Sequence, residues 1–182
     1  MKKRLLLLIS IFMIGVLTAC GKSVEDTSVE LIIPASFFSE NITQEELDKQ
    51  EAETEGVAYT LNEDGTVLCK MTKETHETMI ANVTADIDSS IEEMLADKEN
   101  YPTFTAVTMN DKGTEFTIKT TAGSEEELSM TELFANLYLS LMGGTYQVFA
   151  GVPEADRNII IHYVNDASGQ TIYTYDASQA EN

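Results

Sequence analysis

The chain has 182 residues, of which 31 are Asp or Glu and 11 are Lys or Arg, and its formal charge at pH 7 is −20. Such an acidic chain is unsuited to nucleic acid, because contacts with phosphates require clustered Lys and Arg. Anionic lipid headgroups repel it for the same reason. We therefore expect no nucleic-acid partner, and any membrane attachment has to come from something other than basic charge.

The first twenty residues have the order of a bacterial lipoprotein signal. Residues 2–4 are basic, residues 5–17 form an uncharged apolar run, and two small residues follow. This order is typical of a secretory signal peptide, and the run is shorter than the roughly 18 apolar residues of a membrane-spanning helix. Residues 17–20 resemble a lipobox, whose cysteine receives a diacylglycerol and becomes the mature N-terminus. The lipobox residues are Leu17, Thr18, Ala19 and Cys20.

This signal predicts how the chain is organised and where it is found. We expect residues 1–19 to be removed, residues 20–27 to form a lipidated N-terminus and tether, and residues 28–182 to form a single acidic domain. Two acyl chains, such as palmitate chains on a diacylglycerol, hold a protein stably where one is marginal. The protein is therefore expected at the cell membrane, anchored through Cys20 on the extracytoplasmic face. The alternative is an ordinary signal peptide whose cleavage site happens to precede a cysteine.

The next residues predict a strand and a helix. Residues 28–34 are rich in Val and Ile and end at Pro34, which cannot extend a strand ladder. Thr43 and Glu46 have the spacing of a capping box, in which each side chain satisfies the other's free backbone N–H. We therefore predict a first strand over residues 28–34 and a helix from Thr43 to about Thr54.

A hairpin and a longer helix are predicted next. Residues 57–61 and 66–71 alternate between apolar and polar and are separated by a turn that ends in Gly65. Over residues 73–98, apolar side chains recur at spacings of three and four, and acidic ones occupy the remaining positions. The apolar stripe of this helix consists of Ile80, Val83, Ile87, Ile91, Met94 and Leu95.

The same order then recurs. Residues 105–109 and 114–120 flank a turn that ends in Gly113, and Ser124 with Glu127 predicts the capping box of another helix. Two glycines at 143 and 144 predict its end. We expect its core-facing residues to be Leu133, Phe134, Leu137, Tyr138, Leu141 and Met142. Leu139 lies off that stripe, which indicates either burial or an oligomer contact, with burial as the default.

A last hairpin is predicted from residues 158–164 and 170–175. Together with the 48-residue spacing of Gly65 and Gly113, it suggests a degenerate repeat of hairpin plus helix, although hairpin turns favour Gly in any case. The fold class that follows is α+β: an antiparallel sheet built from β-hairpins, with amphipathic helices packed on one face. The apolar registers of the two hairpins differ by one residue.

Candidates for chemistry are few. Cys69 alternates with apolar neighbours and is interpreted as a small buried hydrophobe rather than a nucleophile. His76 stands beside acidic residues at a helix start and His162 lies within a strand, and neither has a second histidine at zinc spacing. We interpret both as structural and predict no catalytic residue, metal site or cofactor. Phe37-Phe38 and Tyr146 with Phe149 could line a ligand groove, but they more often close a core.

The lipobox, the segment Ile32-Ile33-Pro34-Ala35-Ser36-Phe37-Phe38 and the turn at residues 62–65 together resemble small lipoproteins of Gram-positive gut bacteria that carry no assigned activity. The resemblance implies location and provides no catalytic residue. The leading hypothesis is a non-enzymatic module that binds a protein, peptide or envelope component. The alternatives are a small-molecule-binding lipoprotein that serves a transporter and, with less support, an envelope hydrolase that uses scattered carboxylates.

Overall fold

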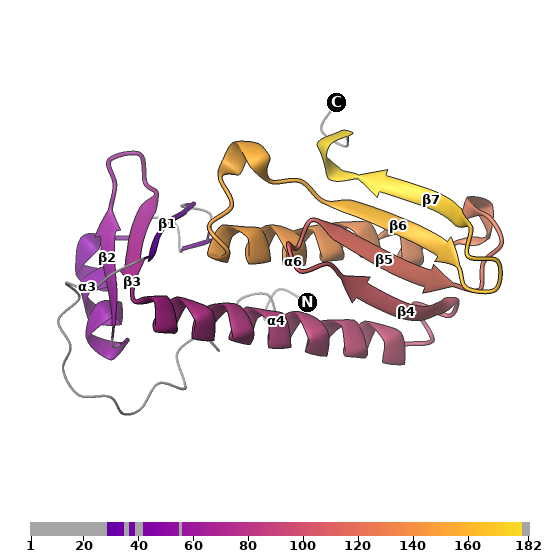
Figure 1. Ribbon diagram of the computed structural model, residues 1–182, viewed down its shortest axis with the longest axis horizontal. Coiled ribbons are helices and arrows are strands. Elements are labelled where there is room, and N and C mark those ends of the chain that lie inside the picture. Colours follow the sequence, from indigo (N-terminus) through magenta and orange to yellow (C-terminus); the bar gives the residue numbers. More distant parts are fainter. Residues whose placement is uncertain (1–28, 35–36, 39–41, 55, 180–182) are drawn as a thin grey trace. The chain divides into compact units, whose positions relative to one another are not determined.

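The computed structural model describes residues 29–34, 37–38, 42–54 and 56–179 of the chain, and Figure 1 shows the elements they form. The protein has the predicted α+β class, with helices and two separate β-sheets. Within the span that the sequence treats as one domain, the chain divides into two compact units that meet between Asn82 and Val83. Each unit is described by itself.

The first unit contains a three-stranded antiparallel sheet. Its strands are β1 (Val29–Ile33), β2 (Val57–Leu61) and β3 (Val67–Met71), in the order β1-β3-β2. The pairing of β2 with β3 confirms the first predicted hairpin. Alternate residues of β3 are buried, as expected for a strand with one covered face.

The helix α3 (Gln44–Glu53) covers the free edge of β2, one of the two edge strands of this sheet. The Gln44 side chain accepts a hydrogen bond from Leu61 N (2.8 Å) and donates one to Tyr59 O (3.0 Å), and Glu51 accepts from Tyr59 N (3.2 Å). An unpaired strand edge is a template for association with other strands, and these side chains occupy it. The predicted capping box between Thr43 and Glu46 is confirmed.

The second unit contains a four-stranded sheet with one parallel pair. Its strands are β4 (Phe104–Met109), β5 (Glu115–Thr120), β6 (Ile160–Asn165) and β7 (Thr171–Asp176), in chain order across the sheet. The two outer pairs are the predicted antiparallel hairpins, but β5 and β6 are parallel. The expectation of a single antiparallel sheet was therefore wrong. Parallel neighbours require a long crossover, and the helices between β5 and β6 provide it.

Three α-helices are associated with this sheet or lead into it. They are α4 (Lys73–Ala96), α5 (Met130–Leu133) and α6 (Ala135–Phe149). Short 3-10 turns occur at Glu125–Glu127, Glu154–Asp156 and Ala177–Gln179. Among the described residues, none of the helices combines the length and the apolar character of a membrane-spanning segment.

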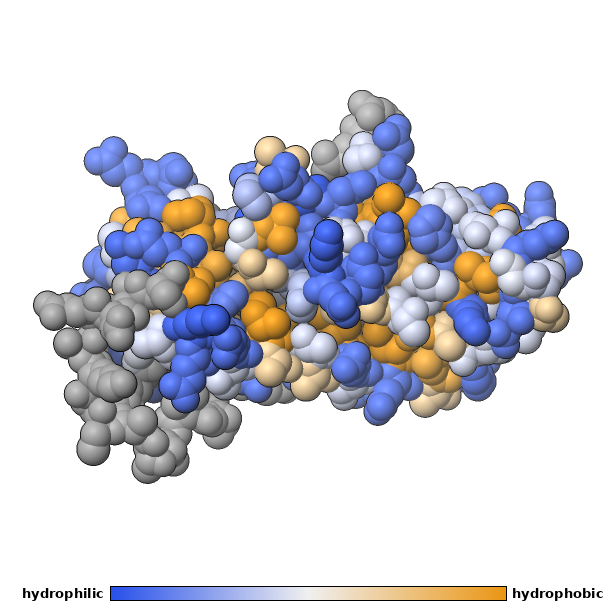
Figure 2. Space-filling model, viewed as in Figure 1, coloured by the Kyte–Doolittle hydropathy of each residue, from blue (hydrophilic) through white to orange (hydrophobic). Residues whose placement is uncertain are grey.

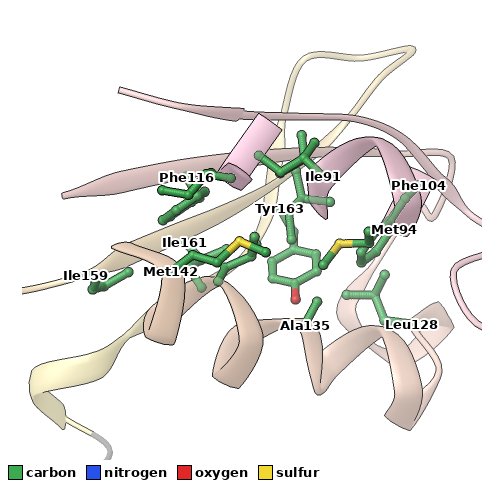
Figure 3. Packing of buried hydrophobic residues seen from close by; sticks show 14 of the residues in the cluster. Ile91, Met94, Phe104, Phe116, Leu128, Ala135, Met142, Ile159, Ile161 and Tyr163 are labelled. Carbon is green, nitrogen blue, oxygen red and sulfur yellow. The ribbon is translucent and has the colours of Figure 1, made fainter. Parts of the chain in front are cut away.

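One hydrophobic core lies between the four-stranded sheet and the helices on one of its faces. Tyr163 stands at its centre in Figure 3, with its hydroxyl directed toward α6, and the Phe104 ring meets it edge-on with the two ring centroids 5.9 Å apart. The strand residues of the core alternate, as in Phe116 and Ile118 of β5. The helices contribute Val83, Ile87, Ile91 and Met94 from α4 and Ala135, Leu139 and Met142 from α6.

The first two hairpin turns use a glycine in the left-handed region. Gly65 has φ +84° and Gly113 has φ +65°, and each glycine N–H donates to the carbonyl of the turn's leading asparagine, Asn62 or Asn110, at 3.0 Å. Side chains with a Cβ rarely adopt this conformation, so glycine closes both turns.

The lengths of these turns explain the one-residue difference in apolar register. Asn62 N donates to Thr66 O, four residues on, whereas Asn110 N donates to Glu115 O, five residues on. The second turn contains one extra residue before the ladder resumes. Because side chains alternate along a strand, this residue moves the inward set of β5 to Phe116 and Ile118.

Helix α6 approaches the sheet most closely at Gly143. A Cβ added there would lie 2.4 Å from Ile159 Cδ1 and 2.9 Å from the Gly113 carbonyl oxygen. A Cβ added at Gly144 would meet nothing within 4 Å. The predicted end of the helix at these glycines was wrong, because the helix continues to Phe149 and Gly143 serves close packing instead.

Gly143→Ala and Gly144→Ala should therefore have opposite effects. We expect Gly143→Ala to lower the free energy of unfolding by about 1–3 kcal/mol, because the core has no room for the methyl group. Gly144→Ala should raise it by roughly 0.5–1 kcal/mol, because alanine favours a helix interior. Urea unfolding of both variants at the same dilute protein concentration measures this, and equal effects of the two would contradict the packing described.

Candidate functional site

The side of α5 and α6 that faces the sheet carries polar residues as well as small apolar ones. Glu132, Asn136 and Gln147 are all buried, and they share this side with Ala135 and Leu139. Buried polar groups are costly unless they are hydrogen-bonded. Each of the three has specific partners, and these partners determine which way the helix is turned.

Glu132 joins the start of the helix to the start of β4. Its carboxylate accepts hydrogen bonds from the backbone and hydroxyl groups of Thr103 and of Ser129. Burial alone would raise the pKa of Glu132, but these four hydrogen bonds outweigh it and lower the pKa below its ordinary value. The carboxylate is therefore held in its charged form.

Ser129 and Glu132 also form the capping box of this helix. The box predicted at Ser124 and Glu127 was wrong, because Ser124 makes no side-chain cap bond and precedes only a 3-10 turn. The Glu127 carboxylate instead accepts from Gly123 N at 2.8 Å. Ser124 with Glu127 and Ser129 with Glu132 have the same spacing. Of the two glutamates, Glu132 is the one that accepts hydrogen bonds from Thr103.

Asn136 is fixed by the central tyrosine of the core. The Tyr163 hydroxyl lies 2.9 Å from Asn136 Oδ1 and 3.1 Å from the Glu132 carbonyl oxygen, and it can donate its proton to either acceptor. Burial, aided by nearby Tyr173, raises the pKa of Tyr163, so the hydroxyl remains a donor. The strand β6 thus holds the first turn of α6 by a hydrogen bond within the core.

Gln147 fixes the other end. Its side-chain nitrogen donates to Gly113 O (2.8 Å) and to Asn158 O (2.9 Å), and its side-chain oxygen accepts from Asn158 N (3.2 Å). One buried amide therefore links α6 to the β4–β5 turn and to the chain entering β6. The neighbouring Tyr146 hydroxyl donates to Asp111 O in the same turn.

The opposite side of the helix is apolar and exposed. Five residues follow one another there at helical spacing, and we call them the apolar stripe. They are Met130 (69% exposed), Phe134 (64%), Leu137 (61%), Tyr138 (37%) and Leu141 (52%). Apart from Ile32 of β1, they are the exposed large apolar residues of the described chain.

Four of the residues predicted to face the core are therefore exposed. Phe134, Leu137, Tyr138 and Leu141 belong to the apolar stripe, whereas Met142 is buried in the core and Leu133 packs against it, as predicted. The expectation was wrong for the four exposed residues because it followed the largest side chains. Leu139 was the signal in the sequence, since a second stripe of Ala135, Leu139 and Gly143 passes through it at spacings of four.

The apolar stripe lies in a part of the chain without charge. No Asp, Glu, Lys, Arg or His occurs from Leu133 to Pro153, in a chain that carries 31 acidic residues. Hydrophilic residues predominate on the face that Figure 2 shows, as such a composition requires. Because full burial of one such side chain stabilises by about 1.5–3 kcal/mol, covering the stripe would release several kcal/mol. A surface of this kind typically marks a site of interaction.

The remaining predicted site residues fall in different places. The lipobox residues Leu17, Thr18, Ala19 and Cys20 lie outside the described residues. Cys69 is free and buried in β3, and burial raises its pKa to about 12, so its thiol is poorly suited to act as a nucleophile at neutral pH.

The two histidines belong to different units of the chain. His76 lies half-buried in the first turns of α4. His162 lies on the face of the second sheet opposite the core, where its Nδ1 is 3.2 Å from Thr174 Oγ1. Asp166, the acid nearest to it in sequence, pairs with Lys119 instead (3.5 Å).

The aromatic pairs considered as groove residues are half-buried. Phe37 and Phe38 follow β1, and Tyr146 and Phe149 pack against the core of the second unit. The Tyr146 ring covers Gly113, where an added Cβ would lie 2.4 Å from its Cδ1. Within the described part of the chain, no group of three or more His, Cys, Asp or Glu side chains is placed to hold a metal ion.

Comparison with protein-family models, with curated proteins and with solved structures finds no match for this chain.

Two leucines of α6 offer a matched test of the apolar stripe. Leu139→Ala should lower the free energy of unfolding by about 2–5 kcal/mol, because it opens a cavity in the core. Leu137→Ala should change it by no more than about 0.5 kcal/mol, because that side chain contributes little to the folded monomer. Urea denaturation measures both, and a large loss from Leu137→Ala in dilute solution would show that the stripe serves folding.

Glu132→Gln tests the buried carboxylate. At pH 7 the variant should be less stable than the parent by about 1–3 kcal/mol, since hydrogen bonds to a charged group are replaced by weaker ones. Because the folded-state pKa of Glu132 lies below its ordinary value of 4.5, its stabilisation is present above that pH and is lost as the pH falls through the folded-state pKa. The difference between parent and variant should therefore narrow on acidification, and a gap that stays constant from pH 7 to pH 3 would contradict this.

Proposed function

We propose that this protein is a lipoprotein anchored through Cys20 on the extracytoplasmic face of the cell membrane, where it acts as a binding module rather than an enzyme. The observation that carries the binding role is the apolar stripe on α5 and α6. It offers an uncharged contact surface on a chain with a net charge of −20.

The composition of the stripe supports a protein as the ligand. Aromatic residues and Met are enriched at the centres of protein interfaces, and charged residues are depleted there. Phe134 and Tyr138 supply large side chains with few rotatable bonds, and such residues dominate binding energy. Since the helix is held from behind by Glu132 and Gln147, the stripe is presented on a rigid element, which reduces the entropy lost on binding.

The anchor supports the location. A signal peptide followed by a lipobox sends the chain through the membrane and attaches it there by two acyl chains. The strongly acidic body is repelled by anionic headgroups, so the lipid is the source of membrane affinity. The stripe would then meet partners that are exposed at the cell surface.

Cys20→Ala tests the anchor, with Cys69→Ala as the matched control. In a bacterium that lipidates its own lipoproteins, we expect the parent and Cys69→Ala to incorporate labelled palmitate and to sediment with membranes. Cys20→Ala should lose the label and leave the membrane fraction, because no other acylation site remains. Mass spectrometry showing an unmodified Cys20 thiol in the mature parent would contradict the proposal.

A further inference from the structure

We propose that the apolar stripe is the contact through which two copies of this chain pair, with their α6 helices antiparallel. This deepens the proposed function and rests on it, because it names the partner of the surface described above.

The spacing is that of a helix–helix seam. Met130, Phe134, Leu137 and Leu141 are separated by four, three and four residues, and Gly144 follows after three more. Alternation of three and four is the pattern by which two helices interlock side chains along their length. The helices α5 and α6 are joined at Phe134, which has right-handed helical dihedral angles and whose N–H donates to Met130 O at 3.0 Å, so Met130 precedes the α6 residues of the seam by one turn.

The seam is complementary to itself when reversed. An antiparallel pair with its two-fold axis at Leu137 places Phe134 opposite Leu141 and Met130 opposite Gly144 of the second copy. A large side chain then meets an open position, because a Cβ added at Gly144 meets nothing within 4 Å. Two-fold pairing through one self-complementary patch is also the commonest form of oligomer.

The distribution of charge favours association of two copies through the apolar stripe. Two copies of this acidic chain, each with 31 Asp and Glu residues, repel one another wherever their carboxylates face. The uncharged span from Leu133 to Pro153 lets them come together without placing a carboxylate against a carboxylate.

A lipid bilayer fits the same surface less well. Helices that lie in the membrane interface usually flank their apolar face with Lys and Arg, which attract anionic headgroups. The span from Leu133 to Pro153 contains neither.

The area is appropriate for pairs that form on a membrane. Five side chains of this size and exposure supply on the order of 500 Å², against about 800 Å² per partner in a standard interface. Polar residues beside the stripe would provide the rest. Anchoring confines copies to one surface and raises their effective concentration, so an interface of modest area is sufficient.

Cysteine cross-linking on intact cells tests the pairing. The full chain carrying Leu137→Cys is expressed in a bacterium that lipidates its own lipoproteins, and the cells are oxidised with copper phenanthroline. The two engineered thiols lie at the two-fold axis, within the roughly 7 Å between Cα atoms that a disulfide requires. We expect a disulfide-linked species of twice the chain mass. Adding Phe134→Glu to the same chain should reduce it roughly tenfold or more, because a central aromatic contact is replaced by a charge.

Two controls define the outcome. Thr108→Cys, exposed on the opposite face of the second sheet, should link far less, and the parent should not link. Equal linking of Thr108→Cys and Leu137→Cys would overturn the pairing, as would a product of another mass or protection of the engineered thiol by lipid without a link. Fractionation of the same cells separates the two proposals. Membrane-bound chain without the link overturns the pairing alone, whereas linked chain in the medium overturns the anchor alone.

Discussion

The rotation of α6 about its own axis is the constraint on which the surface of the second unit depends. Glu132, Asn136 and Gln147 lie on one side of α5 and α6, and their partners come from the residue before β4, from β6 and from the β4–β5 turn. Rotating the helix about its axis would separate all three side chains from their hydrogen-bond partners. A buried polar group without a partner lowers the stability of the fold by about 1–3 kcal/mol. With that side committed to the sheet, the large apolar residues can only face outward.

This arrangement departs from the usual amphipathic helix, in which apolar residues face the core and polar ones face water, because buried polar residues share the inward side and large apolar residues lie on the outward side. The inward side gains close contact instead: Gly143 brings the helix backbone against Ile159 and the Gly113 carbonyl. The inward side also buries Leu139 and Met142, so the helix is held to the sheet without the residues of the apolar stripe. Folding of the chain therefore leaves the apolar stripe exposed to water. Burial of the stripe against a partner would contribute a favourable free energy of association.

Much of the fold could be predicted from the sequence because the signals were local. The Thr43–Glu46 box, the Gly65 and Gly113 turns and the stripe of α4 all lie within a few residues of what they determine. The sequence also showed which face of α4 packs against the core, because acidic residues occupy the opposite face. In α6 neither side carries an exposed charge, so periodicity alone could not distinguish them. The deciding contacts, such as Gln147 with Gly113, span 34 residues.

The lack of charge on α6 is also what supports the binding role proposed for it. An acidic body keeps copies and other acidic proteins apart wherever carboxylates face outward, so attraction at short range is confined to the uncharged span. If the chain is anchored as proposed, the lipid adds no specificity and only determines where and how often copies meet. The specificity of the proposed contact then rests on one face of α5 and α6, whose opposite side is fixed to the sheet by the hydrogen bonds of Glu132, Asn136 and Gln147.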